Sequence, residues 1–272
     1  MLRMQRIPLS DRRFHGGVPS GGMTETQRGR VRVEPSAKRV RAYLGGQLAA
    51  DSVRPMLVWE SPHYPTYYLP VADLRVKLEP NGQTRPSPSR GDGTEFDVVA
   101  DGVIAAGAAV RHLDSPIPEL RELVKLDFHA MDEWLEEDEP IYVHPRDPYT
   151  RVDILFSSRH VRVALNGETL ADSHSPHILF ETGLPPRYYL PLSDLRRELL
   201  RPSASRTSCP YKGHAEYWDV QLGETTHADL VWIYRTPLPE SQKIAGLASF
   251  YNEKVDIWVD GELQPRPKTP FS

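Results

Sequence analysis

The chain has 272 residues, of which 39% are hydrophobic and 26% are charged, and its formal net charge is -4. This composition is typical of a folded globular protein, and its slightly acidic balance argues against binding to nucleic acid or to an anionic membrane surface. No apolar run approaches the roughly 20 residues that a membrane helix needs. The single cysteine, Cys209, excludes an intramolecular disulfide, so we expect a cytoplasmic protein.

The first 30 residues are rich in Arg, Gly, Ser and Pro and contain no apolar signal core. We predict that residues 1–30 form a disordered tail and that the chain is not secreted by the signal-peptide route. Met23 stands just before the first strand-like run, so the natural start is either Met1 or Met23.

A long internal repeat follows the tail. Residues 31–78 align with residues 152–199 at a constant shift of 121, and 20 of the 48 positions are identical. With one added residue in the second copy, the match resumes further along the chain. A period of this length is typical of a duplicated domain rather than of a solenoid unit. We therefore predict a first β-rich domain over residues 31–144 and a second over residues 145–272.

Short alternating runs separated by turn residues predict strands in both copies. In the first copy, residues 40–44 alternate before a Gly-Gly pair, and in the second copy residues 159–165 alternate before Asn166-Gly167, a strong hairpin signal. Further strands of the second copy are predicted at residues 178–180, 187–190, 217–222, 230–234 and 255–259.

Two short helices are predicted in the second copy. One begins at Ser193 or Asp194 and runs through Leu200, and the other begins at Pro239. The second helix would present an apolar face made of Ile244, Leu247, Phe250 and Tyr251. An acidic run at residues 133–139 is interpreted as a solvated face or linker. These elements predict a mainly β fold with one or two short helices in each copy.

Residues 207–218 bring many functional groups together just before a strand of the second copy. Cys209 supplies a thiol, Lys212 an ammonium and His214 an imidazole. Lys212 would favour the thiolate of Cys209, which is the nucleophilic form, or Lys212 and His214 could act as acid and base. The plainer interpretation is that Cys209 is a small buried residue on a turn and that Lys212 is a solvated loop residue.

Aromatic rings accompany this motif along the second copy. The predicted ligand-binding residues are Tyr189, Tyr211, Lys212, Tyr217, Trp232, Tyr234 and Tyr251. These rings are equally compatible with an ordinary core. In the first copy, Ser87 aligns with Cys209 and Val110 aligns with Trp232, so we expect the first copy to be mainly structural.

The metal-ligand inventory argues against a metal site. Cys209, His214 and His227 could in principle bind zinc, but the chain has no Cys-x-x-Cys pair, and no helix-spaced histidine couple lies near Cys209. We predict no metal and no cofactor.

The string Cys-Pro-Tyr-Lys-Gly-x-Ala-x-Tyr at residues 209–217 resembles a family motif. It is preceded by Tyr-Tyr-Leu-Pro and followed by Trp-x-Tyr and Phe-Tyr. With these blocks, the second copy resembles the family called domain of unknown function 427, which is sometimes labelled nucleotidyltransferase-like. The resemblance implies a small β-rich domain similar to the β-tent group and implies no established activity. The chain has no Gly-Ser followed by paired Asp and no Gly-rich phosphate loop.

These observations predict a module that binds a small anionic or aromatic molecule in the second copy, with no nucleic-acid or membrane partner. The first alternative is an enzyme for a small substrate that uses Cys209 or the pair of Lys212 and His214. The second alternative is a structural or interaction protein whose partner the sequence does not identify.

Overall fold

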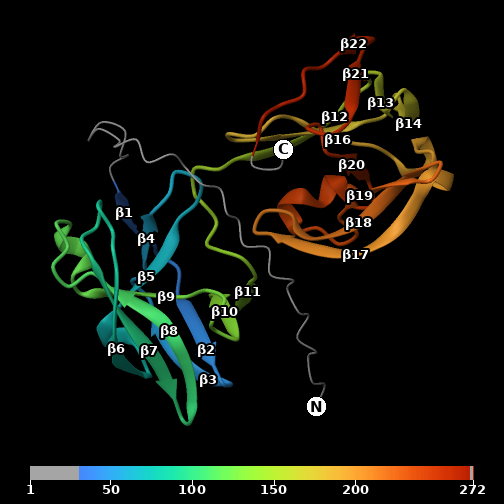
Figure 1. Ribbon diagram of the computed structural model, residues 1–272. Coiled ribbons are helices and arrows are strands. Elements are labelled where there is room, and N and C mark those ends of the chain that lie inside the picture. The colour runs from blue at the N-terminus through green and yellow to red at the C-terminus, as the bar shows by residue number, and fades with distance from the viewer. Residues whose placement is uncertain (1–30, 270–271) are drawn as a thin grey trace. The chain divides into compact units, whose positions relative to one another are not determined.

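The computed structural model describes residues 31–269 and residue 272, and the predictions for residues 1–30 lie outside this part of the chain. The described residues form several antiparallel sheets, and their helical segments are short 3₁₀ turns (Figure 1). The predicted mainly β fold is confirmed. Within the described residues, no helix is long and apolar enough to span a membrane.

The first repeat consists of two antiparallel sheets. Its strands are β1 (Arg32–Pro35), β2 (Val40–Leu44), β3 (Gln47–Ser52), β4 (Met56–Trp59), β5 (Thr66–Pro70), β6 (Lys77–Arg85), β7 (Gly93–Ala100), β8 (Val103–Arg111), β9 (Leu123–Leu126), β10 (Glu133–Glu136) and β11 (Glu139–Ile141). The larger sheet has the order β1-β4-β5-β9-β8-β7-β6, and the smaller has the order β11-β10-β2-β3. Between strands lie the 3₁₀ turns η2 (Val71–Asp73) and η3 (Pro118–Leu120).

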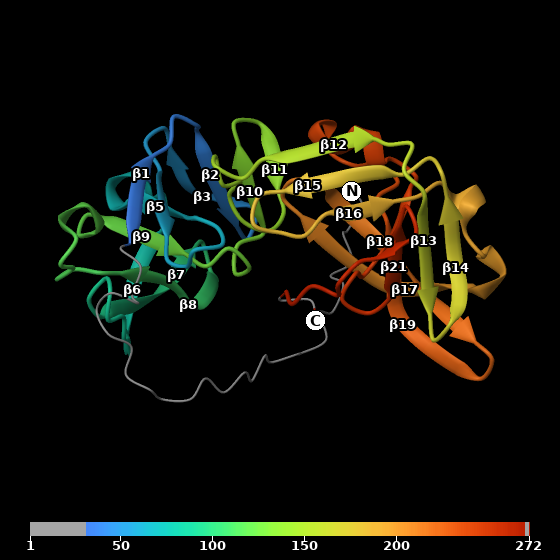
Figure 2. The same cartoon turned by 90° about the horizontal axis from the view of Figure 1, so that it is seen from above.

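The second repeat uses the same order of strands. Its strands are β12 (Val152–Phe156), β13 (Val161–Leu165), β14 (Glu168–Ser173), β15 (His177–Glu181), β16 (Arg187–Tyr189), β17 (Leu200–Cys209), β18 (Gly213–Leu222), β19 (Thr225–Ile233), β20 (Ala248–Phe250), β21 (Asp256–Val259) and β22 (Glu262–Leu263). The sheets are β12-β15-β16, β17-β18-β19-β20 and β14-β13-β21-β22, and Figure 2 shows β12, β15 and β16 side by side.

The first two of these sheets correspond to the single large sheet of the first repeat. The backbone amides and carbonyls of Leu190 and Ala248 exchange two hydrogen bonds of 2.7 and 2.9 Å. This bridge joins the end of β16 to β20 and restores the strand order of the first repeat. The cavity described below lies where these two sheets meet.

Local sequence explains the hairpins at the start of each repeat. Val161, Val163 and Leu165 are buried on one face of β13, as their alternation predicts. Asn166 and Gly167 have φ values of 52° and 85°, the left-handed conformation that a tight hairpin turn requires. The pairing of β13 with β14 therefore confirms the predicted hairpin.

The helix predictions are wrong in extent. In place of a helix from Ser193 to Leu200, the chain makes two single 3₁₀ turns, η4 (Leu192–Asp194) and η5 (Arg197–Leu199). Asp194 does not cap a helix, because its carboxylate accepts a hydrogen bond of 2.6 Å from the Ser173 hydroxyl.

The helix that begins at Pro239 ends after η6 (Pro239–Ile244). The chain leaves the helical conformation at Ala245, which has φ and ψ values of -55° and 121°, Gly246 follows with a φ of 73°, and Phe250 then pairs with Val231 as part of β20. The apolar spacing that suggested one helical face instead comes from a short helix followed by a strand.

The acidic run at residues 133–139 is also not a simple linker. Part of it forms β10, which pairs with β2, and Trp134 is buried in the core with 3% of its surface exposed. The acidic residues at the two ends of β10 therefore flank a strand that packs Trp134 into the core.

Each repeat has its own buried apolar clusters. In the second repeat, one cluster is built on Val161, Leu190 and Phe250, and a separate one is built on Tyr189, Trp232 and Tyr234. The second of these clusters is unusual because most of its large members are Tyr or Trp, whose polar groups need partners when buried. It forms the wall of the candidate site.

Candidate functional site

The motif of the second repeat folds into a hairpin between β17 and β18. Cys209 pairs with Gly213, so Pro210, Tyr211 and Lys212 form the turn. Gly213 has a φ of 93°, which a residue with a side chain rarely adopts. The Leu238 amide donates a 3.1 Å hydrogen bond to the Lys212 carbonyl, which holds the turn against the following loop.

Strand alternation divides the motif between two faces of β18. Gly213, Ala215 and Tyr217 are buried, whereas His214 is exposed. The Nδ1 atom of His214 lies 2.8 Å from the hydroxyl of Ser208 on the neighbouring strand. The structure therefore does not bring His214 to the buried side of the hairpin.

The buried side of the hairpin lines a cavity of about 390 Å³. Seven of the predicted site residues line it: Tyr189, Cys209, Lys212, Tyr217, Trp232, Tyr234 and Tyr251. They come from the four strands β16, β17, β18 and β19, from the turn between β17 and β18, and from the segments that follow β19 and β20. Residues separated by more than 60 positions in the sequence thus share one wall.

Tyr211, like His214, was predicted as a site residue but does not line this cavity. Its ring is 8% exposed, and its hydroxyl accepts a 2.8 Å hydrogen bond from the backbone amide of Asp147. Its carbonyl accepts a 3.0 Å hydrogen bond from the Ser241 hydroxyl. These contacts anchor the hairpin turn.

The aromatic wall is held by ring contacts and hydrogen bonds. The indole N–H of Trp232 donates to the Tyr189 hydroxyl at 3.1 Å, and the two rings meet edge to face. The rings of Trp232 and Tyr251 have centroids 4.7 Å apart. The hydroxyl of Tyr217 lies 2.8 Å from that of Thr207 and 3.5 Å from that of Tyr251.

Burial raises the pKa values of three phenols of this wall. It raises the pKa of Tyr189 to about 12, and it raises the pKa values of Tyr234 and Tyr251 well above the ordinary value for tyrosine. At neutral pH these groups are therefore hydrogen-bond donors and acceptors without charge.

The polar end of the cavity is a buried ion pair between Lys212 and Glu181. The Lys212 ammonium lies 2.5 Å from a Glu181 carboxylate oxygen, and the two side chains are 12% and 9% exposed. Burial alone would lower the pKa of Lys212, but the proximity of Cys209, Glu181 and Tyr189 raises it to about 12. The ammonium is therefore charged, and the pair as a whole is neutral.

Sequence reasoning did not identify Glu181 or Arg187, which both line the cavity. Arg187 donates two hydrogen bonds of 2.7 Å to Glu253, so this cation also has its own carboxylate. A signal for Glu181 was present, because it is identical to Glu60 in the self-alignment of the two copies.

The first repeat contains the corresponding carboxylate in a different setting. Glu60 accepts hydrogen bonds from Tyr68 at 2.6 Å and from Lys125 at 2.7 Å, and it pairs with Arg90 at 2.5 Å. Burial would raise the pKa of Glu60, but these partners lower it below the ordinary value. Leu247 aligns with Lys125, so the second repeat has no counterpart of that cation.

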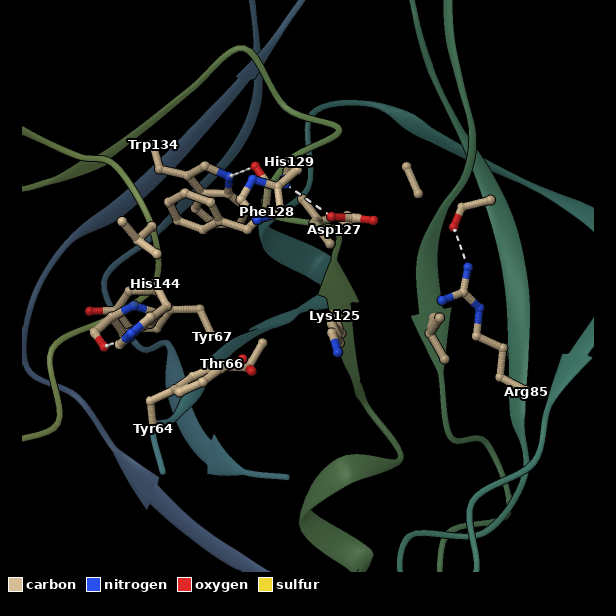
Figure 3. A pocket seen from close by; sticks show the side chains of 16 residues that line it. Tyr64, Thr66, Tyr67, Arg85, Lys125, Asp127, Phe128, His129, Trp134 and His144 are labelled. Atoms are coloured by element: carbon tan, nitrogen blue, oxygen red, sulfur yellow. Dashed lines mark hydrogen bonds between the residues drawn. The ribbon is translucent and has the colours of Figure 1, made fainter. Parts of the chain in front are cut away.

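The cavity of the first repeat that contains Val110 is smaller, at about 220 Å³, and has other walls (Figure 3). The rings of Phe128 and Trp134 stack with centroids 5.3 Å apart, and Tyr64 stacks on His144 at 4.1 Å. Val110 lines it at the position that aligns with Trp232. The two repeats share a scaffold but differ in the chemistry of their cavities.

Comparison with known families places both repeats in one group. Residues 32–137 and 153–261 match a single family model, described as Domain of unknown function (DUF427). The resemblance expected from the motif is thereby confirmed for both copies. The predicted boundary between residues 144 and 145 falls between the matched segments. A search of curated proteins found no match.

Proposed function

Because the chain belongs to the family described as Domain of unknown function (DUF427), whose description names no activity, we propose its function from the cavity of the second repeat. This repeat binds a small planar molecule that carries a neutral polar group able both to donate and to accept hydrogen bonds. The planar part lies against the aromatic wall, and the polar group faces Lys212 and Glu181.

The observation that carries the proposal is the unfilled bonding capacity of Glu181. Among the described residues, the Glu181 carboxylate has one side-chain partner, Lys212. The Glu60 carboxylate has three side-chain partners. A carboxylate can accept several hydrogen bonds, so Glu181, which lines the cavity, has capacity for further donors. A ligand donor would use it.

The charge balance favours a neutral polar group over a simple anion. The two cations at the cavity, Lys212 and Arg187, are each compensated by a carboxylate. An anionic ligand would have to displace Glu181 or remain close to it, and like charges in a poorly hydrated site repel strongly. An amide or a related heteroaromatic group meets the donor and the acceptor at once.

Saturation-transfer NMR and thermal shift with benzamide, nicotinamide and benzoate would test this function. We expect the two amides to bind wild-type protein better than benzoate does. Trp232→Val introduces the residue found in the first repeat, and it should abolish the response. Val110→Ala in the first repeat is the matched control and should leave it unchanged. Equal responses of wild type and Trp232→Val would disprove the proposal.

A second candidate is a small-substrate enzyme in which Cys209 is the nucleophile. It is supported by the half-buried thiol, which lines the same cavity as Lys212. The rate of alkylation by iodoacetamide at pH 7 tests it. A rate no faster than that of free glutathione would exclude an activated thiol.

A further inference from the structure

The exposed face of the β13–β14 hairpin carries a second group of functional side chains. His160, Asp172 and His174 each offer one ligand atom, and these atoms all lie within 4.8 Å of one another. None of the three lines the cavity of the second repeat. The group is therefore independent of the proposed ligand site.

Strand register explains why the three side chains meet. Val161 pairs with Ser173, so His160, just before β13, faces His174, just after β14. Asp172 lies two residues before His174 and therefore points to the same face. Val161 and Ser173 are buried, so this face is the outer one.

The contacts within the group are close. The Nε2 atom of His160 lies 2.6 Å from a carboxylate oxygen of Asp172. The rings of His160 and His174 are stacked, with centroids 4.2 Å apart and an interplanar angle of 13°. Imidazole nitrogen and carboxylate oxygen are preferred ligands of Zn²⁺ and related transition-metal ions.

Nearby cations are directed away from the group. Arg162 is opposite Asp172 in the register, but its guanidinium lies over the Trp258 ring of β21, 3.8 Å from the centroid. Arg159 pairs with Asp260 at 2.7 Å. Among the described residues, the Asp172 carboxylate therefore hydrogen-bonds His160 and pairs with neither arginine.

The first repeat shows what the same positions hold when they serve structure alone. Arg39 aligns with His160, and its guanidinium donates two hydrogen bonds of 2.7 and 2.6 Å to Asp51, the counterpart of Asp172. Val53 aligns with His174. The second repeat keeps the carboxylate and has imidazoles in place of a cation and an apolar residue.

We propose that His160, Asp172 and His174 bind a divalent transition-metal ion such as Zn²⁺, with water completing its coordination. Asp172 and His174 are exposed and the His160 side chain is 35% exposed, so His160 and Asp172 can rotate apart to admit an ion between them. The ion would link the start of β13 to the end of β14.

The test is metal binding by the full chain, with Co²⁺ absorption for ligand type and Zn²⁺ calorimetry for stoichiometry. His174→Val and His160→Arg introduce the residues of the first repeat and should preserve folding. We expect each to weaken Zn²⁺ binding at this site by about tenfold or more. The control, His214→Ala, should bind like wild type.

The reciprocal variant tests the geometry directly. Arg39→His with Val53→His copies the group into the first repeat, and binding of one additional Co²⁺ ion per chain would support the assignment. The proposal is overturned if wild type and His174→Val bind the same number of ions with the same affinity.

Discussion

Glu60 and Glu181 occupy the same position in two copies of one fold, and their surroundings differ. Glu60 is enclosed by Arg90, Lys125 and Tyr68, whereas Glu181 has Lys212 as its ion-pair partner and lines a cavity. The difference shows that the scaffold needs one buried cation at this place and does not need the second.

The tyrosine beside each carboxylate shows how the change is accommodated. In the first repeat, the Tyr68 hydroxyl donates to Glu60, but in the second, the Tyr189 hydroxyl accepts from Trp232. One aromatic substitution, Val110 in the first repeat and Trp232 in the second, therefore supplies a ring to the wall and a new partner for the phenol.

The largest effect is expected from breaking the buried pair of the second repeat. Glu181→Gln leaves the Lys212 ammonium buried opposite a neutral group and should cost about 4 kcal/mol in the free energy of unfolding. Urea unfolding followed by circular dichroism measures this. Glu181→Leu combined with Lys212→Met removes both charges and should cost much less. A double variant as unstable as the single one would contradict this view of the pair.

Trp232→Val should have the next largest effect on stability. It removes most of a buried indole and its hydrogen bond to Tyr189, and we expect a loss of about 3 kcal/mol. The same urea experiment applies, with Trp218→Val, a partly exposed site on β18, as the control. A loss at Trp232 no larger than that at Trp218 would mean that the aromatic wall is not packed as described.

Alkaline pH should weaken the second repeat in a defined window. The folded pKa of Lys212, about 12, is above its ordinary value of 10.5, so its stabilising contribution is complete below pH 10.5 and is lost as pH rises through 12. This loss amounts to about 2 kcal/mol. Unfolding free energies measured from pH 9 to 12 should fall less steeply in Lys212→Met, and parallel curves would argue against the raised pKa.

The smallest effect is expected from removing the extra cation of the first repeat. Lys125 is about a third exposed and Glu60 keeps Arg90 and Tyr68, so Lys125→Leu should cost about 1 kcal/mol. Leu247→Lys makes the reverse change and should supply a second partner to Glu181. If that variant still binds benzamide like wild type, the unfilled capacity of Glu181 is not what recognises the ligand.

Much of the fold follows from local pattern. The alternation of Val161, Val163 and Leu165 and the Asn166-Gly167 turn predict the β13–β14 hairpin, because strand period and positive φ are local properties. The helix expected through Phe250 fails because that residue pairs with Val231, a partner supplied by a distant strand. Tertiary pairing overrides a short helical period.

The candidate site could be predicted where spacing in the sequence coincides with one face of a strand. Tyr217 follows Gly213 and Ala215 on the inner face of β18, whereas His214 lies on the outer face. We predicted His214 as a site residue because it is close to Cys209 and Lys212 in the sequence, but strand alternation places it on the opposite face. Glu181 was missed because its partner, Lys212, is 31 residues away and only the fold brings the two charges together.

The placement of Trp232 gives the cavity a spectroscopic reporter. Among the described residues, Trp232 is the one of the five tryptophans that lines the cavity of the second repeat. Its N–H donates to the Tyr189 hydroxyl, and its ring packs against that of Tyr251. Its emission, isolated as the difference between the spectra of wild type and Trp232→Val, should respond when a planar molecule stacks beside it. The protein thus carries an intrinsic fluorophore for titrating its own ligand.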